Sequence, residues 1–196
     1  MVILYFHGFN SPAPTDKAEK FEALIKRSIP DAQVIVLLYD SANLNDEIPR
    51  LDAVVENCIT EYDVVGFMGS SLGGFIAQHM ARKFERKMVL INPCLNPQEL
   101  LKTFVGTQPN HTTGGTWEFT TESFSEIGQY VPKTYNHEYG ALILLDEGDD
   151  VVDHELTIKA YSGRAEVLEF PGGSHRFDHM REASPHIREF LQAVWL

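Results

Sequence analysis

Apolar residues are distributed through this sequence in two distinct rhythms. Mainly apolar runs of four or five residues predict buried strands, at Val2–Phe6, Val34–Leu38, Val64–Met68, Met88–Ile91, Ala141–Leu145 and Val167–Phe170. Between them, apolar residues recur every three or four positions, which predicts amphipathic helices. The first of these helices begins at about Asp16, and the second runs from Leu44 to Ile59. A third follows the third strand, and the last lies around Ile187 near the end of the sequence. Strands joined by helices predict an α/β fold, with a mostly parallel sheet covered by helices on both faces.

One segment interrupts this alternation. Residues 97–138 carry glycines and scattered aromatic side chains without a clean period. A long irregular segment inside a compact domain commonly covers a functional site. We therefore predict one compact domain over residues 1–196, with residues 97–138 as a cap-like insertion. The alternative is a poorly periodic pair of helices that only seals the sheet.

Composition and charge narrow the classes of partner. No run approaches the ~20 apolar residues of a membrane span, and the first apolar run resembles a strand more than a signal peptide. The two cysteines, Cys58 and Cys94, are isolated in the sequence, which favours buried thiols in a reduced cytoplasm. A formal charge of −12 opposes binding to nucleic acid. The expected partner is a small molecule, and assembly into a homo-oligomer remains open.

A serine motif follows the third strand. The segment Gly69-Ser70-Ser71-Leu72-Gly73 matches G-x-S-x-G between a predicted strand and a predicted helix. In such a turn the residues two before and two after the serine crowd together, so both must be small. Ser71 has glycines at both places, whereas Ser70 would have Met68 and Leu72. Ser71 is therefore the candidate nucleophile. A tight packing turn without chemistry is the alternative, and a phosphate loop is disfavoured because no Walker lysine follows.

A candidate carboxylate and a candidate imidazole lie on loops that leave the same edge of the predicted sheet. Asp149 and Asp150 follow the strand at Ala141–Leu145, and His175 follows the strand at Val167–Phe170. The chain order serine, acid, histidine is that of a hydrolase, in which the histidine acts as base. Asp149 is preferred as the acid because Val151 and Val152 follow it, and Asp150 is the alternative. Asp146 and Asp153 are expected to be solvated loop or capping residues.

The loop after the first strand, His7-Gly8-Phe9-Asn10, completes the predicted site. The backbone N–H groups of Phe9 and Leu72 are expected to form an oxyanion hole. His7, Gly8 and Asn10 are expected to contact the substrate, with His7 fixing the loop through hydrogen bonds. His175 and His179 could share a metal if they lay on one helix, but no third ligand is evident. We therefore expect no metal and no cofactor.

Together these motifs resemble the YqiA/YcfP family of small bacterial esterases. The matching segments are Tyr5-Phe6-His7-Gly8-Phe9-Asn10-Ser11, Gly69-Ser70-Ser71-Leu72-Gly73-Gly74, Asn92-Pro93, Gly148-Asp149-Asp150-Val151-Val152-Asp153 and Gly172-Gly173-Ser174-His175-Arg176-Phe177. The resemblance implies a compact α/β-hydrolase fold that lacks the first two strands of larger hydrolases. It also implies Ser71, Asp149 and His175 as a catalytic triad.

The activity that this resemblance implies is hydrolysis of short- to medium-chain acyl esters, or of acyl thioesters. The insertion would then set the acyl specificity. Two other functions fit the same motifs: a catalytically silent binding module with the hydrolase fold, and a triad hydrolase that cleaves an amide or a carbon–carbon bond.

Overall fold

A computed structural model describes residues 1–11, 16–110 and 114–193 of the chain. Strands and helices alternate through most of the sequence, as predicted. The elements of the main body are β1 (Val2–Phe6), α1 (Asp16–Ser28), β2 (Gln33–Leu37), η1 (Ser41–Asn43), α2 (Leu44–Glu61), β3 (Val64–Ser70), α3 (Leu72–Phe84), β4 (Lys87–Ile91), β7 (Ala141–Asp146), α5 (His154–Tyr161), β8 (Glu166–Phe170) and α6 (Met180–Gln192).

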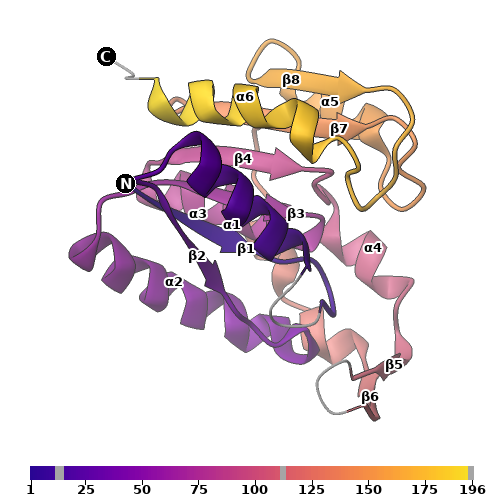
Figure 1. The fold of residues 1–196 in the computed structure, drawn as a ribbon. Coiled ribbons are helices and arrows are strands. Elements are labelled where there is room, and N and C mark those ends of the chain that lie inside the picture. The colour runs from indigo at the N-terminus through magenta and orange to yellow at the C-terminus, as the bar shows by residue number, and fades with distance from the viewer. Residues whose placement is uncertain (12–15, 111–113, 194–196) are drawn as a thin grey trace.

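The six main strands form one parallel sheet in the order β2-β1-β3-β4-β7-β8 (Figure 1). All six strands predicted from the apolar runs are present. The predicted α/β fold with a mostly parallel sheet and helices around it is therefore confirmed. From β1 the chain passes first to one neighbour, β2, and later to the other, β3. In open α/β sheets, the crevice beyond the carboxyl ends of two such strands is the usual ligand site.

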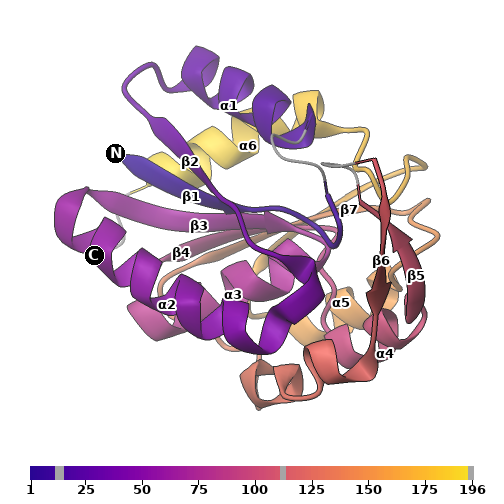
Figure 2. The ribbon, with the colours of Figure 1, turned by 90° about the horizontal axis from the view of Figure 1, so that it is seen from below.

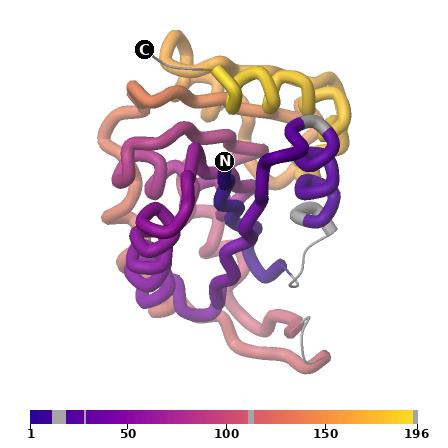
Figure 3. The backbone as a smooth tube through the Cα atoms, turned by 60° about the vertical axis from the view of Figure 1, so that its left-hand side comes forward, coloured from indigo at the N-terminus to yellow at the C-terminus, as the bar shows by residue number. Residues whose placement is uncertain are grey.

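Both faces of the sheet are buried, which explains why its strands are apolar at nearly every position. Along β1, Leu4 and Phe6 belong to one core cluster and Ile3 and Tyr5 to another, because successive side chains of a strand point to opposite faces. The first cluster contains residues of α2 and α3, and the second contains residues of α1 and α6. Figures 2 and 3 show these two helix pairs on opposite sides of the sheet.

The insertion at residues 97–138 is not a pair of helices. Its described residues, 97–110 and 114–138, form one short helix, a two-stranded antiparallel hairpin and two 3-10 turns: α4 (Pro97–Lys102), β5 (Gly106–Pro109), β6 (Thr116–Phe119), η2 (Thr121–Phe124) and η3 (Ile127–Tyr130). Figure 2 shows this segment beyond the carboxyl ends of the main strands. The scattered aromatic residues of the sequence are explained by packing, since Phe104 and Phe119 both contact the ring of Phe9.

Hydrogen bonds also join the insertion to the main body. The side-chain amide of Asn10 donates to the carbonyl of Pro109 at 3.0 Å. The amide of Asn45, in α2, donates to the carbonyl of Glu122 at 2.6 Å. The insertion is thus held against the loop after β1 and against the start of α2. Among the described helices, none is both long and apolar enough to cross a bilayer.

Candidate active site

Ser71 lies in a tight turn between β3 and α3. Its backbone has φ 55 and ψ −124, a conformation uncommon for a residue with a side chain. A Cβ atom on Gly69 would lie 2.0 Å from the carbonyl oxygen of Gly73, and one on Gly73 would lie 2.2 Å from the carbonyl oxygen of Phe6. Both positions therefore require glycine. The turn holds Ser71 at the carboxyl edge of the sheet and at the amino end of α3, as its motif predicts.

The side chains of Ser71, His175 and Asp149 form a continuous hydrogen-bonded relay. The Nε2 atom of His175 lies 2.9 Å from Ser71 Oγ. Its Nδ1 atom lies 2.9 Å from Oδ1 and 2.8 Å from Oδ2 of Asp149. Because an ionised carboxylate can only accept, Nδ1–H must donate to Asp149. In the neutral ring, Nε2 is then the acceptor for the Ser71 hydroxyl proton, which is the arrangement that a general base requires.

The Asp149 carboxylate is held as an anion by several donors. Its side chain is fully buried, and its Oδ1 also accepts from the backbone N–H groups of Val151 at 2.8 Å and Val152 at 3.0 Å. Burial alone would raise the pKa of Asp149, but the hydrogen bonds from His175, Val152 and Val151 outweigh it and lower the pKa. The neighbouring Asp150 is exposed. The structure thus pairs His175 with Asp149, and not with the alternative acid.

The loop after β1 passes directly beside the nucleophile turn. A Cβ atom on Gly8 would lie 3.5 Å from the Cβ of Ser71, which is ordinary contact. Leu72 is the first residue of α3, and the N–H groups of a first helical turn have no acceptor within the helix. The two residues predicted to form the oxyanion hole are therefore close to Ser71. Leu72 follows it directly in the sequence, and Phe9 follows Gly8, which lies beside it in space. The ring of Phe9 points into the insertion, where it stacks on Phe104 with centroids 5.1 Å apart.

His7 is buried behind this loop and is held from several sides. Its Nδ1 donates to the carbonyl of Gly8 at 2.8 Å, and its ring stacks on Tyr39 with centroids 4.1 Å apart. The hydroxyl of Tyr39 donates to the His7 carbonyl at 2.6 Å. Burial lowers the pKa of His7 and outweighs the hydrogen bond to Gly8, which acts in the opposite direction. The lowered pKa keeps the imidazole neutral. Its side chain therefore fixes the loop through hydrogen bonds and stacking.

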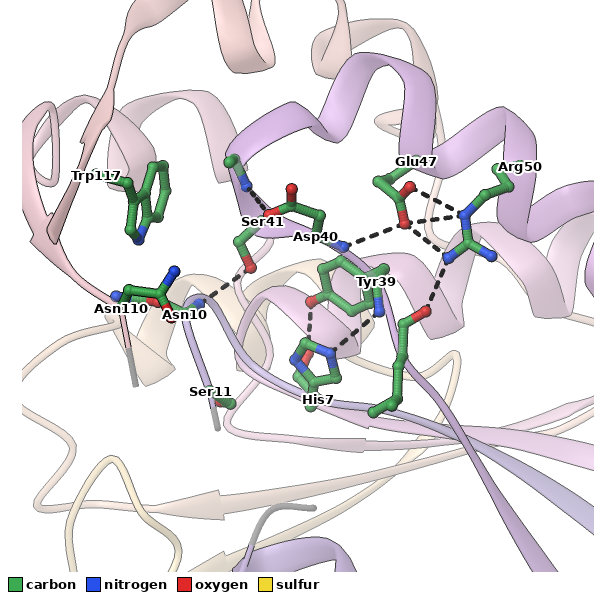
Figure 4. A pocket seen from close by; sticks show the side chains of 12 residues that line it. His7, Asn10, Ser11, Tyr39, Asp40, Ser41, Glu47, Arg50, Asn110 and Trp117 are labelled. Atoms are coloured by element: carbon green, nitrogen blue, oxygen red, sulfur yellow. Dashed lines mark hydrogen bonds and ion pairs between the residues drawn. The ribbon is translucent and has the colours of Figure 1, made fainter. Parts of the chain in front are cut away.

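His7 and Asn10 line a cavity of about 540 Å³ next to the loop after β1 (Figure 4). Its wall includes polar and aromatic side chains, among them Tyr39, Ser41, Glu47, Arg50, Asn110 and Trp117. The Arg50 guanidinium is held by Glu47 at 2.7 Å and by the carbonyl of Leu38 at 2.8 Å. Neither Ser71 nor His175 lines this cavity. It adjoins the loop after β1, so it lies next to the nucleophile turn without containing it.

The prediction that Asp146 is a solvated or capping residue is wrong. Asp146 is the last residue of β7, and it is completely buried. Its carboxylate accepts hydrogen bonds from the loop that carries His175. The apolar run ends at Leu145, but the strand continues one residue further and takes Asp146 into the buried sheet. Asp153 does cap α5, since its carboxylate accepts from the N–H of Glu155 at 3.0 Å.

His175 and His179 do not face one another as a metal pair would. His175 lies in the loop before α6, and His179 is the residue that precedes the first turn of α6. Each bonds to a different carboxylate, His175 to Asp149 and His179 to Asp146 at 2.8 Å. Among the described residues, no group of three or more histidine, cysteine and acidic side chains is arranged to hold a metal ion.

The sequence of the whole chain matches one protein family. A profile of the family described as "Uncharacterised protein family (UPF0227)" matches residues 2–192. The chain belongs to the UPF0227 family. This is the YqiA/YcfP-type family, so the resemblance noted from the motifs is confirmed.

Curated UPF0227 proteins match the chain over almost their full length. One from Shewanella woodyi is 24% identical over 193 residues, covering 96% of this chain and 98% of its own. One from Shewanella sediminis is 26% identical over 196 residues, covering 98% of this chain and 100% of its own.

Solved structures with similar folds are α/β-hydrolases. Est1E from Butyrivibrio proteoclasticus superposes with a TM-score of 0.74 at 16% identity, covering 97% of this chain and 86% of its own. The esterase domain of a Rhodothermus marinus protein superposes with a TM-score of 0.70 at 15% identity, covering 97% of this chain and 87% of its own. At this level of identity the comparison shows that the UPF0227 chain has the α/β-hydrolase fold.

Proposed function

We propose that this protein is a serine hydrolase that cleaves short- to medium-chain acyl esters or acyl thioesters through an acyl-enzyme intermediate. The single observation that carries the proposal is the relay, in which His175 Nε2 lies 2.9 Å from Ser71 Oγ and Nδ1 lies 2.8 Å from Asp149 Oδ2. A hydroxyl, a neutral imidazole and a buried carboxylate in this order are the requirements for nucleophilic attack by serine. The esterase domain of the Rhodothermus marinus protein, which shares the fold, supports the same reaction class.

In the first half-reaction, Ser71 Oγ attacks the carbonyl carbon of the ester while its proton passes to His175 Nε2. The imidazolium is stabilised by the Asp149 carboxylate, whose negative charge is secured by its other hydrogen bonds. The negative charge that develops on the substrate oxygen is taken by the backbone N–H groups of Phe9 and Leu72, the latter at the positive end of α3. The tetrahedral intermediate collapses, and the leaving alcohol or thiol receives the proton from His175.

In the second half-reaction, water attacks the acyl-serine with His175 again acting as base. The carboxylic acid leaves and the Ser71 hydroxyl is restored. The insertion at residues 97–138 lies next to the proposed oxyanion hole, because its aromatic side chains surround Phe9. In this proposal it caps the site and limits the length of the acyl chain, while His7, Gly8 and Asn10 shape the substrate-binding loop.

The test uses p-nitrophenyl esters of increasing acyl length, the matching acyl-CoA thioesters and a fluorophosphonate probe. The wild-type protein should turn over the esters and label covalently, and Ser71→Ala should lose both properties. Ser70→Ala removes the adjacent hydroxyl, which bonds to Tyr5 on the other side of the turn, and it serves as the matched control for labelling. A wild-type protein that neither labels nor hydrolyses these substrates would instead support the silent binding module.

A further inference from the structure

The carboxylate of Asp146 is buried directly behind the loop that carries His175. Its Oδ2 accepts from the backbone N–H groups of Ser174 at 3.1 Å and Asp178 at 2.7 Å. Its Oδ1 accepts from Nδ1 of His179 at 2.8 Å. The Asp146 side chain is 0% exposed, so all three bonds lie away from water at that end. One carboxylate thus holds the loop one residue before His175 and again three and four residues after it.

A second buried residue holds the peptide of His175 itself. Asn92 follows β4 with a positive φ of 40, and it is 1% exposed. Its side-chain amide donates to the carbonyls of Ser174 at 3.0 Å and His175 at 3.4 Å. Its side-chain oxygen accepts from the backbone N–H of Asp146 at 2.9 Å. Asn92 and Asp146 therefore form one connected unit beneath the base.

The loop needs this support because its own sequence gives it little rigidity. Gly172 and Gly173 both have a φ of 73, a conformation that favours glycine. A Cβ atom on Gly173 would lie 2.0 Å from Asp146 Oδ2, so the backbone packs against the carboxylate with no room for a side chain. The same loop is bonded to the acid's loop, since the N–H of Gly148 donates to the carbonyl of Gly172 at 2.7 Å. The positions of base and acid are therefore set together.

We propose that Asp146 is a positioning residue, which with Asn92 and His179 holds the His175 imidazole in line between Ser71 and Asp149. This inference rests on the proposed hydrolase function. His179 gives the buried anion a partner that can carry positive charge. The hydrogen bond to Asp146 raises the pKa of His179, and the carboxylates of Glu182 and Asp178 act in the same direction. Charge-assisted bonds of this kind are shorter and stronger than neutral ones and suit a rigid support.

The test is Asp146→Asn, compared with Asp153→Asn as a matched control. Both variants exchange a carboxylate for an amide of the same shape, but Asp153 only caps α5. Rates are divided by the concentration of active sites from fluorophosphonate titration, so that unfolded protein does not count. We expect kcat of Asp146→Asn to fall roughly 10- to 100-fold with little change in KM, because displacement of a catalytic group by about 1 Å costs that much. Asp153→Asn should keep the wild-type kcat.

Two further readouts separate positioning from simple support of the fold. The acid limb of the kcat/KM pH profile should move to lower pH in Asp146→Asn, because a displaced imidazolium loses its contact with the Asp149 carboxylate. The proton NMR signal of His175 Nδ1–H, assigned by its loss in His175→Ala, should shift or vanish. If the variant has a lower melting temperature but the wild-type kcat per site, pH limb and proton signal, Asp146 only supports the fold and the inference is wrong.

His179→Gln keeps the question decidable if Asp146→Asn does not fold. The His179 side chain is 25% exposed and its loss removes one of the three bonds to Asp146. We expect a smaller fall in kcat, roughly 3- to 10-fold, with the same direction of change in the proton signal. An unchanged kcat and signal would refute the inference. A wild-type protein without hydrolase activity would refute only the proposed function, because the NMR signal still reports whether His175 is held.

Discussion

Replacement of Asp149 by asparagine should disable the relay while leaving its shape intact. The oxygen Oδ1 of Asp149 accepts from the N–H groups of Val151 and Val152, at 2.8 and 3.0 Å. An asparagine will keep its oxygen there, because a nitrogen in that place would face two donors. Its NH₂ group then takes the place of Oδ2, which lies 2.8 Å from Nδ1 of His175. Nδ1 also lies 2.9 Å from Oδ1, but the NH₂ group now beside it opposes an N–H on Nδ1. The ring proton therefore moves to Nε2.

The size of the effect follows from this change of tautomer. With a proton on Nε2, the imidazole no longer accepts the proton of Ser71 Oγ, 2.9 Å away. The serine then attacks without a base. A wrong tautomer in a Ser-His-Asp site costs about 10⁴-fold in kcat, which equals about 5 kcal/mol of transition-state stabilisation. KM should change little, because Asp149 lies behind the imidazole and does not face the substrate.

The assay is steady-state hydrolysis of p-nitrophenyl butyrate by Asp149→Asn, with Asp150→Asn as the matched control. Asp150 is the exposed neighbour that carries the same charge. Only the first variant should lose about four decades of kcat, and its circular dichroism spectrum should match the wild type. The reasoning is wrong if Asp149→Asn stays within 10-fold of the wild-type kcat, or if Asp150→Asn falls as far.

Two other predictions concern the turn and the acid. Gly73→Ala should abolish esterase activity and lower the melting temperature by several degrees, because its Cβ would lie 2.2 Å from the carbonyl oxygen of Phe6, and backbone atoms there cannot move aside. Gly8→Ala, whose Cβ would meet nothing closer than 3.5 Å, is the control for stability, and thermal melts that treat the two variants alike would contradict the clash. The lowered pKa of Asp149 also predicts a pH-dependent stability. Its contribution is present above the unfolded-state pKa of about 3.9 and is lost as the pH falls through the lower folded-state value. In urea titrations the stability difference between wild type and Asp149→Asn should therefore shrink from about pH 5 toward pH 3, and a constant difference would argue against an ionised, hydrogen-bonded Asp149.

The geometry around Ser71 could be predicted from local sequence because the cause is local. The glycines at 69 and 73 are needed by the turn itself, and a buried strand and an amphipathic helix on either side leave distinct patterns. The same holds for the parallel sheet, since apolar runs joined by helices have few other ways to bury both faces. Parallel strands then bring the loops after β1, β3, β7 and β8 to one edge, so the meeting of Ser71, Asp149 and His175 could be predicted without their contacts.

The insertion illustrates where such prediction stops. Its hairpin, β5 with β6, gives only a weak signal because each strand has four residues, too few for the alternation of covered and exposed side chains to stand out. Its order comes from contacts with distant residues, such as Asn10 with Pro109, 99 positions apart. No local pattern encodes such a contact.

The linear chain was sufficient for the elements, the sheet and the tight turn around the candidate serine, because turn sterics and the burial period act between near neighbours. The sequence favoured Asp149 over Asp150, but only the folded molecule decided between them, since the choice depends on which side chain points to a ring 26 residues away. The burial of Asp146 against the loop that carries His175 is likewise visible only in the folded molecule, because its partners lie 28 to 33 residues further along the chain. Adjacent carboxylates look alike in a sequence, and their pKa values and partners are set by whatever the tertiary structure packs against them.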